Sequence, residues 1–150
     1  MRQIKKGELF AFWNPYHKCF IKMTGTGLTV SPKKEDGILP SNWDSEVFLL
    51  VDAGYDKVAF WNPYHKCFIK MTGTGLTVSP KKEDGILPSN WDSEVFLLVD
   101  AGYDKVAFWN PYHKCFIKMT GTGLTVSPKK EDGILPSNWD SEVFAANKVM

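Results

Sequence analysis

Residues 59–106 read AFWNPYHKCFIKMTGTGLTVSPKKEDGILPSNWDSEVFLLVDAGYDKV, and this 48-residue string decides the fold. The same string stands unchanged at residues 11–58, and its first 38 letters stand again at residues 107–144. Only the tails, 1–10 and 145–150, differ from the unit. One copy cannot bury its own apolar face, so the three copies must share a core.

The identity of the copies extends to positions where a folded protein tolerates change. The polar run KKEDG at 81–85 recurs letter for letter in the other copies. Substitutions at exposed positions usually change stability by less than about 0.5 kcal/mol, so inherited copies diverge there. The sequence therefore favours deliberate symmetrisation, with a very recent natural duplication as the alternative.

Composition restricts the class of protein and its partners. The chain has 150 residues, 43% of them hydrophobic and 23% charged, which is typical of one globular domain. Eighteen basic residues face seventeen acidic ones, and this balance gives no electrostatic footprint for nucleic acid or an anionic membrane. No apolar stretch approaches the roughly 20 residues of a spanning helix. We therefore expect neither nucleic acid nor membrane as a partner.

Three cysteines occur, one per copy, at Cys19, Cys67 and Cys115. An odd count at this spacing argues against a disulfide framework and predicts reduced thiols, as in a cytoplasmic expression compartment. His65 and Cys67 could both ligate zinc, but one pair supplies only two of the usual four ligands. We expect no metal site.

Each copy predicts four short strands separated by turn-forming residues. In the middle copy these strands are 58–61, 67–71, 76–78 and 94–99. Alternation within the second strand places Cys67, Ile69 and Met71 on one face and Phe68 on the other. No window shows a helical period over ten residues or more. The first two strands are predicted to form a hairpin.

Three four-stranded copies can close in few ways. Propellers typically have about 4–8 blades, and an open stack needs polar caps that tails this short do not supply. Closure around one axis leaves no exposed sheet edge. The sequence therefore predicts one all-β domain over 1–150, with twelve strands in three identical repeats and pseudo-threefold symmetry. The tails should pair, because the cut falls in the turn that corresponds to 100–104.

The order of these features resembles the β-trefoil superfamily, which includes fibroblast growth factors, fascins and ricin-type lectins. Lys66-Cys67-Phe68-Ile69 stands where fascin-like and growth-factor trefoils carry a Gly-Lys-Tyr-Leu-type segment. Glu94-Val95-Phe96 stands where ricin-type repeats carry Gln-x-Trp, and Gly102 with Val106 is similar to the Gly and Ile/Val pair that follows. The resemblance implies a six-stranded barrel capped by three hairpins.

Aromatic and amide side chains in the loops suggest a sugar site. Exposed aromatic rings are the usual platforms for sugars, and neighbouring polar groups can bond the hydroxyls. The candidate residues in each copy correspond to Asn62, Tyr64, His65, Asn90, Trp91 and Asp92. The competing interpretation is that Trp91 plugs the barrel and Trp61 packs on the hairpin, since Trp is highly buried on average.

Two departures from the ricin-type pattern weaken a sugar site of that particular geometry. The stretch at 67–70 has no acid where ricin-type repeats place an Asp directly after their Cys-Leu segment, and Glu94 replaces the Gln. His65 with Cys67 could in principle form a thiolate pair, but no residue is identifiable that would orient the histidine.

The sequence predicts an engineered, monomeric, symmetric scaffold without catalytic activity or cofactor. The first alternative is a carbohydrate-binding module with three equivalent sites for a small sugar. The second alternative is an actin-binding or other protein-binding module, which the resemblance to fascins implies. Fold alone does not decide among them.

Overall fold

The computed structural model describes residues 4–149, which form twelve β-strands and one 3₁₀ turn. Each copy contributes four strands, in the order that the sequence predicts. The elements are β1 (Leu9–Asn14), β2 (Cys19–Met23), β3 (Leu28–Val30), η1 (Asp44–Glu46), β4 (Phe48–Asp52), β5 (Lys57–Asn62), β6 (Cys67–Met71), β7 (Leu76–Val78), β8 (Phe96–Gly102), β9 (Lys105–Asn110), β10 (Cys115–Met119), β11 (Leu124–Val126) and β12 (Phe144–Val149).

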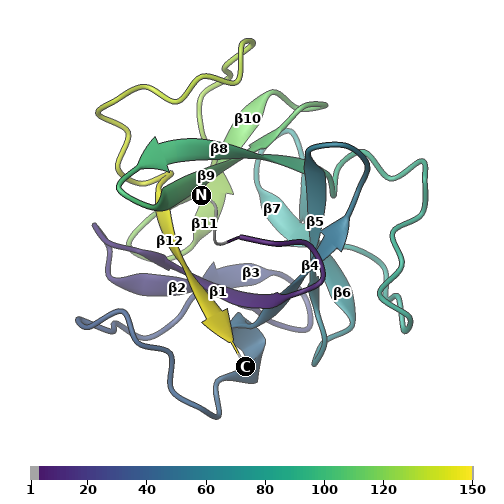
Figure 1. Cartoon of the computed structure of the whole chain (residues 1–150), viewed down its shortest axis with the longest axis horizontal. Coiled ribbons are helices and arrows are strands. Elements are labelled where there is room, and N and C mark those ends of the chain that lie inside the picture. The colour runs from purple at the N-terminus through teal and green to yellow at the C-terminus, as the bar shows by residue number, and fades with distance from the viewer. Residues whose placement is uncertain (1–3, 150) are drawn as a thin grey trace.

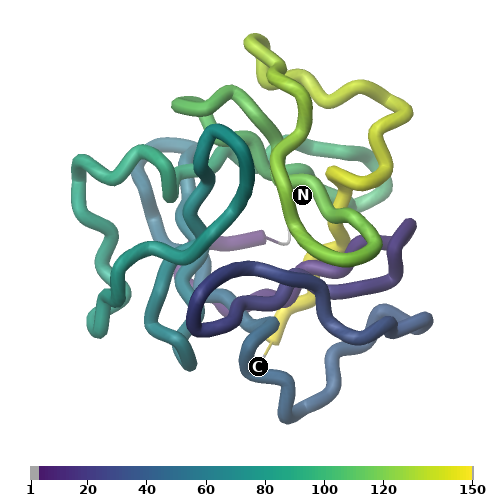
Figure 2. The backbone as a smooth tube through the Cα atoms, turned by 180° about the vertical axis from the view of Figure 1, so that it is seen from behind, coloured from purple at the N-terminus to yellow at the C-terminus, as the bar shows by residue number. Residues whose placement is uncertain are grey.

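Six of the strands close into a barrel. Antiparallel pairing runs from β12 to β1, β4, β5, β8 and β9, and then returns to β12. The other six strands form the hairpins β2–β3, β6–β7 and β10–β11, which continue from β1, β5 and β9. Figure 2 shows these hairpins grouped around the centre of one face, where β3, β7 and β11 contact one another. This architecture is a β-trefoil, as predicted.

Three equivalent phenylalanines meet in the middle of the barrel. Phe12, Phe60 and Phe108 are fully buried, with ring centroids 4.9–5.4 Å apart and planes inclined by 64–78°. Alternation along a barrel strand directs each ring inward and the neighbouring side chains, such as Ala59 and Trp61, outward into a separate cluster. Edge-to-face contacts of this kind add about 0.5–1.5 kcal/mol per pair beyond area burial.

The two faces of β6 separate as the sequence pattern predicts. Cys67, Ile69 and Met71 belong to the main core, whereas Phe68 belongs to the outer cluster. In that cluster Phe68 lies opposite Trp61 in the β5–β6 register. The alternation also confirms that Trp61 packs on the hairpin.

The prediction that Trp91 plugs the barrel is wrong. Trp91 lies in the connection between β7 and β8 and packs, partly buried, against the outer cluster. Its ring meets Phe68 edge-on at a centroid distance of 6.5 Å. The phenylalanines already fill the barrel, so the indole covers the outside of the wall.

The two tails complete the barrel. Strand β1 pairs with β12 from Leu9↔Val149 to Trp13↔Ala145. The equivalent strands β4 and β5 pair in the same way but are consecutive in the chain and joined by a turn, whereas β1 and β12 belong to its opposite ends. Ile4 packs against the main core just before β1. Figure 1 shows β1 and β12 side by side, so the predicted pairing of the tails is confirmed.

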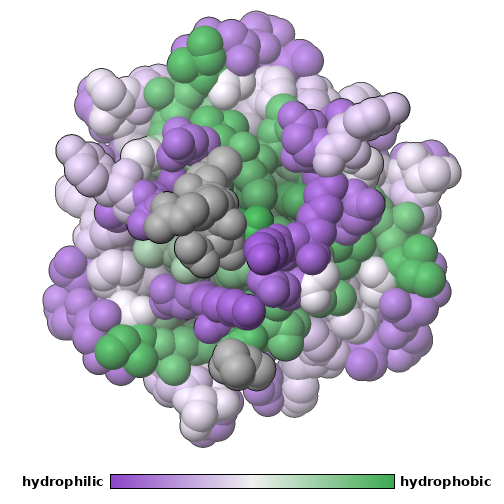
Figure 3. Space-filling model, in the orientation of Figure 1, coloured by the Kyte–Doolittle hydropathy of each residue, from purple (hydrophilic) through white to green (hydrophobic). Residues whose placement is uncertain are grey.

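Long loops precede β4, β8 and β12 and project at the three corners of Figure 1. Each carries one exposed isoleucine, Ile38, Ile86 or Ile134, at 64–65% exposure. Figure 3 shows three separate apolar areas near the rim of this face. No helix among residues 4–149 is long and apolar enough to cross a membrane.

Candidate functional site

A hollow lies beside each long loop, at the junction with the following copy. The first hollow, of about 750 Å³, is lined by loop residues from Gly37 to Val47 and by Pro63 and Tyr64 of the next copy. The second, of about 560 Å³, is lined by residues from Leu87 to Val95 and by Pro111 and Tyr112. These are termed the first and second pockets, and such volumes are typical of small-ligand sites.

The third pocket is built in the same way across the junction between the third and first copies. A hollow of about 550 Å³ follows the loop from Gly133 to Val143. A smaller adjoining hollow brings Asp140 together with Pro15 and Tyr16 of the first copy. All three pockets therefore combine the loop of one copy with the Pro-Tyr turn of another.

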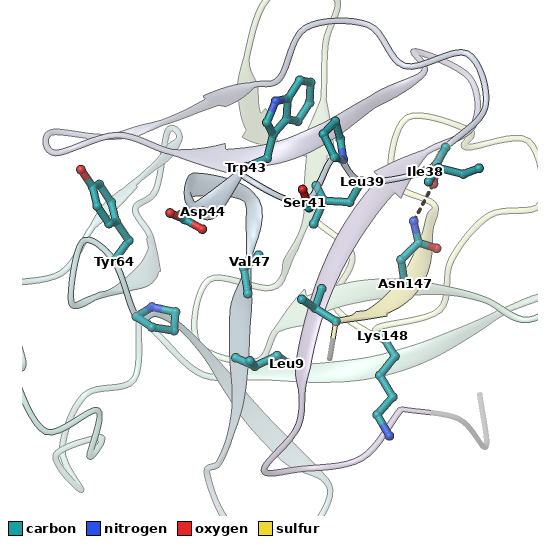
Figure 4. Close-up of a pocket in the computed structure, with 14 residues that line it drawn as sticks. Leu9, Ile38, Leu39, Ser41, Trp43, Asp44, Val47, Tyr64, Asn147 and Lys148 are labelled. Atoms are coloured by element: carbon teal, nitrogen blue, oxygen red, sulfur yellow. Dashed lines mark hydrogen bonds between the residues drawn. The ribbon is translucent and has the colours of Figure 1, made fainter.

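Backbone turns hold the tryptophan and aspartate of each loop in place. In the first copy the Trp43 N–H donates to the Pro40 carbonyl at 3.2 Å, and the Val47 N–H donates to the Asp44 carbonyl at 3.3 Å. The same two bonds recur in the other copies. Figure 4 shows Asp44 between Trp43 and the Tyr64 of the next copy. The pocket thus presents an indole, a carboxylate and a phenol together.

A buried asparagine joins consecutive copies beneath each pocket. Asn62 is fully buried, and its Nδ2 donates to the carbonyls of Asp44, Ser45 and Val47 at 2.9–3.3 Å. Its Oδ1 accepts from the His65 N–H at 2.7 Å. One side chain therefore fixes the turn that carries the tyrosine against the loop that carries the tryptophan.

A histidine adds a second tie across the same junction. Nε2 of His65 lies 3.1 Å from Oγ of Ser45, and the corresponding His113–Ser93 and His17–Ser141 pairs have the same separation. The exposed Tyr64 packs edge-on against His65 at 5.0 Å between ring centroids. The histidine thus orients the tyrosine at the rim of the pocket.

The structure places three of the six sequence-predicted site residues in pockets, two in the framework and one on the exposed loop surface. Tyr64 lines the first pocket, while Trp91 and Asp92 line the second. Asn62 and His65 hold the junction between copies, and the exposed Asn90 is not among the residues that line the second pocket. A site therefore draws on two copies, which sequence reasoning within one copy could not show.

Sequence reasoning missed the third wall of each pocket. The first pocket is closed by Leu9 and by 147–149, whereas Lys57 and Lys105 occupy the equivalent wall of the second and third pockets. Nδ2 of Asn147 donates to the Gly37 carbonyl at 2.6 Å (Figure 4). The strands between copies supply this wall, and no motif in the sequence marks it.

A buried glutamate follows each pocket aspartate by two positions. Glu46, Glu94 and Glu142 are each only 3% exposed. Burial raises the pKa of these carboxyls, and Lys70 beside Glu94 partly opposes the effect on its pKa. These carboxyls are buried and are not among the residues that line the three pockets, whereas Asp44, Asp92 and Asp140 line them and are exposed.

The cysteine thiols also point away from solvent. Cys67 is 7% exposed, its Sγ donates to the His65 carbonyl at 3.5 Å, and burial raises its pKa. A raised pKa disfavours the reactive thiolate. Within residues 4–149 no three His, Cys, Asp or Glu side chains are grouped so that they could hold a metal ion.

Comparison with known proteins gives likeness in fold at low sequence identity. No family model matches the chain, and no curated protein matches it. A structure of SeviL bound to asialo-GM1 saccharide superposes with a TM-score of 0.70 at 12% identity, over 95% of this chain and 98% of that one.

Two further structures extend the likeness. A Polyporus squamosus lectin bound to a human-type influenza-binding epitope gives a TM-score of 0.69 at 14% identity, over 97% of this chain and 50% of that chain. The Haemophilus ducreyi cytolethal distending toxin gives 0.67 at 12% identity, over 100% of this chain and 91% of that one. At these identities the matches establish the β-trefoil fold.

Proposed function

We propose that this chain is a carbohydrate-binding module with one pocket at each junction between copies. The observation that carries the proposal is the grouping of Trp43, Asp44 and Tyr64 around one hollow, with the equivalent grouping at the other two junctions. The likeness to two proteins described as bound to saccharides supports this choice among the functions that the fold can host.

The chemistry of the pocket suits a sugar ring. An indole face packs against the C–H face of a pyranose by burial of apolar area, while a carboxylate accepts hydrogen bonds from hydroxyls, which are stronger when the acceptor is charged. Asp44 and Tyr64 are exposed and can exchange water for sugar hydroxyls. The buried Asn62 holds the two copies together beforehand, which reduces the ordering cost of binding.

We further propose that binding is not followed by chemistry. A thiol nucleophile would need an accessible thiolate, yet the Cys67 thiol is buried and its pKa is raised. Nε2 of His65, which could act as a base, lies 3.1 Å from Oγ of Ser45 in the framework. The burial of the Cys67 thiol favours binding over catalysis by a cysteine nucleophile.

The origin of the chain is a separate proposal: an engineered, monomeric scaffold built from one repeated unit. Three letter-identical copies support it, and so does the recurrence of contacts such as the 3.0 Å bond from each hairpin tryptophan to a lysine carbonyl. Size-exclusion chromatography with light scattering should give the mass of one chain, and a dimer mass would contradict this. The actin-binding or protein-binding alternative stays a prediction, to be tested by cosedimentation with filaments.

The six tryptophans allow sugar binding to be tested at each pocket. In NMR spectra of ¹⁵N-labelled protein, the indole N–H signals are first assigned with Trp→Phe variants. They are then followed during titration with a panel of neutral methyl hexosides and N-acetylhexosaminides. We expect signals of the pocket residues Trp43, Trp91 and Trp139 to move. The hairpin tryptophans are internal controls because their N–H groups already donate to backbone carbonyls. Six stationary signals across the panel would overturn the proposed function.

Removal of the phenol tests the geometry. Tyr64→Ala should weaken binding at the first pocket alone, since that side chain lines only that junction. Tyr55→Ala is the matched control, because Tyr55 is equally a surface tyrosine, 96% exposed, and is not among the residues that line the first pocket. Equal loss of binding in both variants would contradict the assignment.

A further inference from the structure

We propose that the three pockets are of two kinds: the second and third bind two neighbouring sugar hydroxyls between an aspartate and a lysine, whereas the first prefers a sugar with a hydroxyl beside an apolar substituent. The proposal rests on the proposed function and names the sugar class for each pocket. The difference between the pockets lies in the wall that the strands between copies supply. In the first pocket this wall comes from the two unrepeated tails.

The second and third pockets each contain a lysine and an aspartate among their lining residues. Lys57 lines the same hollow as Asp92 and Tyr112, and Lys105 lines the same hollow as Asp140 and Tyr16. A carboxylate accepts from one hydroxyl and an ammonium group donates to the oxygen of the next. This combination suits a vicinal diol, the pattern that every unmodified hexopyranose carries.

The first pocket keeps the aspartate but lacks this lysine. Leu9 occupies the position equivalent to Lys57, so an aliphatic side chain shares the hollow with Asp44 and Tyr64. Val149 adds a second apolar side chain to the same wall. A methyl group, as in a 6-deoxy sugar, would bury against these residues without leaving a polar group unpaired.

Lys148 does not replace the missing ammonium. In Figure 4 its side chain extends away from Trp43 and Asp44. Its Nζ lies 3.3 Å from Oε2 of Glu8, so the ammonium group forms an ion pair with Glu8.

Asp52, the other aspartate that lines the second pocket, already accepts hydrogen bonds within the protein. Oδ1 of Asp52 accepts from Lys6 Nζ at 2.6 Å and from the Gly54 N–H at 2.9 Å. The hydrogen bond from Lys6 lowers the pKa of Asp52 and keeps it ionised. Asp92 and Lys57 are therefore the pair that can turn to a ligand.

The indole signals separate the pockets within one sample. With a methyl hexoside as the probe, the Trp91 and Trp139 signals should move at the same concentration, and the Trp43 signal should need a roughly tenfold higher one, since one hydrogen bond to a charged group is missing there. The matching 6-deoxyhexoside keeps a vicinal diol, so the Trp91 and Trp139 midpoints should stay near their hexoside values, whereas the Trp43 midpoint should fall because the methyl group is buried against Leu9 and Val149. Equal midpoints for all three signals with both probes would overturn the inference while leaving the proposed function standing.

Exchange of the wall residue gives the reciprocal test. Leu9→Lys should bring the first pocket to the midpoint of the others for the hexoside, and the double change Lys57→Leu with Lys105→Leu should bring those two to the midpoint of the first. The three hairpin tryptophan signals, from Trp13, Trp61 and Trp109, report folding and should keep their unliganded positions. Midpoints that do not move after exchange would assign the difference to another feature and contradict the proposal.

Discussion

The backbone of Gly85 lies against the face of the Trp61 indole. A Cβ at position 85 would lie 3.1 Å from Cδ2 and Cε3 of that ring, and the φ of Gly85 is +67°. Nε1 of Trp61 donates to the Lys82 carbonyl at 3.0 Å, so the ring cannot turn away without losing this bond. The start of the long pocket loop is thus held against the hairpin by one glycine and one tryptophan.

This contact predicts a large penalty for a small side chain. Gly→Ala at positions 37, 85 and 133 should lower the free energy of unfolding by about 3–6 kcal/mol in total, because a left-handed backbone costs an L-residue roughly 1–2 kcal/mol at each site before the ring is displaced. Gly→Ala at positions 25, 73 and 121 is the control, since nothing lies within 4 Å of a Cβ there. Urea unfolding compares the two triple variants, and equal midpoints would refute the prediction.

The buried amide between copies should contribute more to stability than the loop amides. Asn62→Ala should cost roughly 1–3 kcal/mol, because it leaves buried carbonyls without their donor, and the donor now serves Asp44, Ser45 and Val47. The exposed Asn90→Ala should stay within about 0.5 kcal/mol of the parent. Thermal unfolding by circular dichroism provides the comparison. A destabilised Asn90→Ala with an unaffected Asn62→Ala would reverse the assignment of the two amides.

The three phenylalanines in the barrel should be the most sensitive apolar positions. Phe60→Ala in one copy should lower stability by about 3–5 kcal/mol, a large part of the total of roughly 5–15 kcal/mol expected for a domain. Ile86→Ala is the control, since Ile86 is 64% exposed. Chemical denaturation measures both. A loss below that of Ile86→Ala would place the core elsewhere.

The buried glutamates should make stability depend on pH. A raised folded-state pKa means that the folded protein binds the proton more tightly than the unfolded chain, so ionisation destabilises the fold. Their contribution favours folding below the unfolded value of 4.5 and is lost as pH rises through the higher folded pKa. Glu→Gln at 46, 94 and 142 should therefore raise the melting temperature at pH 7 and change it least below pH 4.5.

Comparison with the parent isolates this effect from other titrations. Asp52 and Asp132 have lowered pKa values and act in the opposite direction, but they are shared by both proteins. A melting-temperature difference that is constant from acid to neutral pH would show that the glutamates do not titrate as inferred.

Much of the candidate site could not be predicted from the sequence. Tyr64, Trp91 and Asp92 were predicted as ligand contacts and line pockets, but the first belongs to one pocket and the other two to the next. Asn62 looked like a ligand group because exposed amides bond sugars, yet it is fully buried. Which polar side chain faces water depends on contacts between copies that lie far apart along the sequence.

The sequence by itself determined the repeat, the four strands per copy, the alternation along β6 and the pairing of the tails. These follow from local periodicity and from the need of each copy to share its apolar face. Only the tertiary structure decided that Trp91 covers the outside of the barrel, that each pocket spans two copies, and that Leu9, Lys57 and Lys105 each line a pocket. The physical reason is that a pocket wall is set by which strands pair, and in the first pocket those strands are the two unrepeated tails.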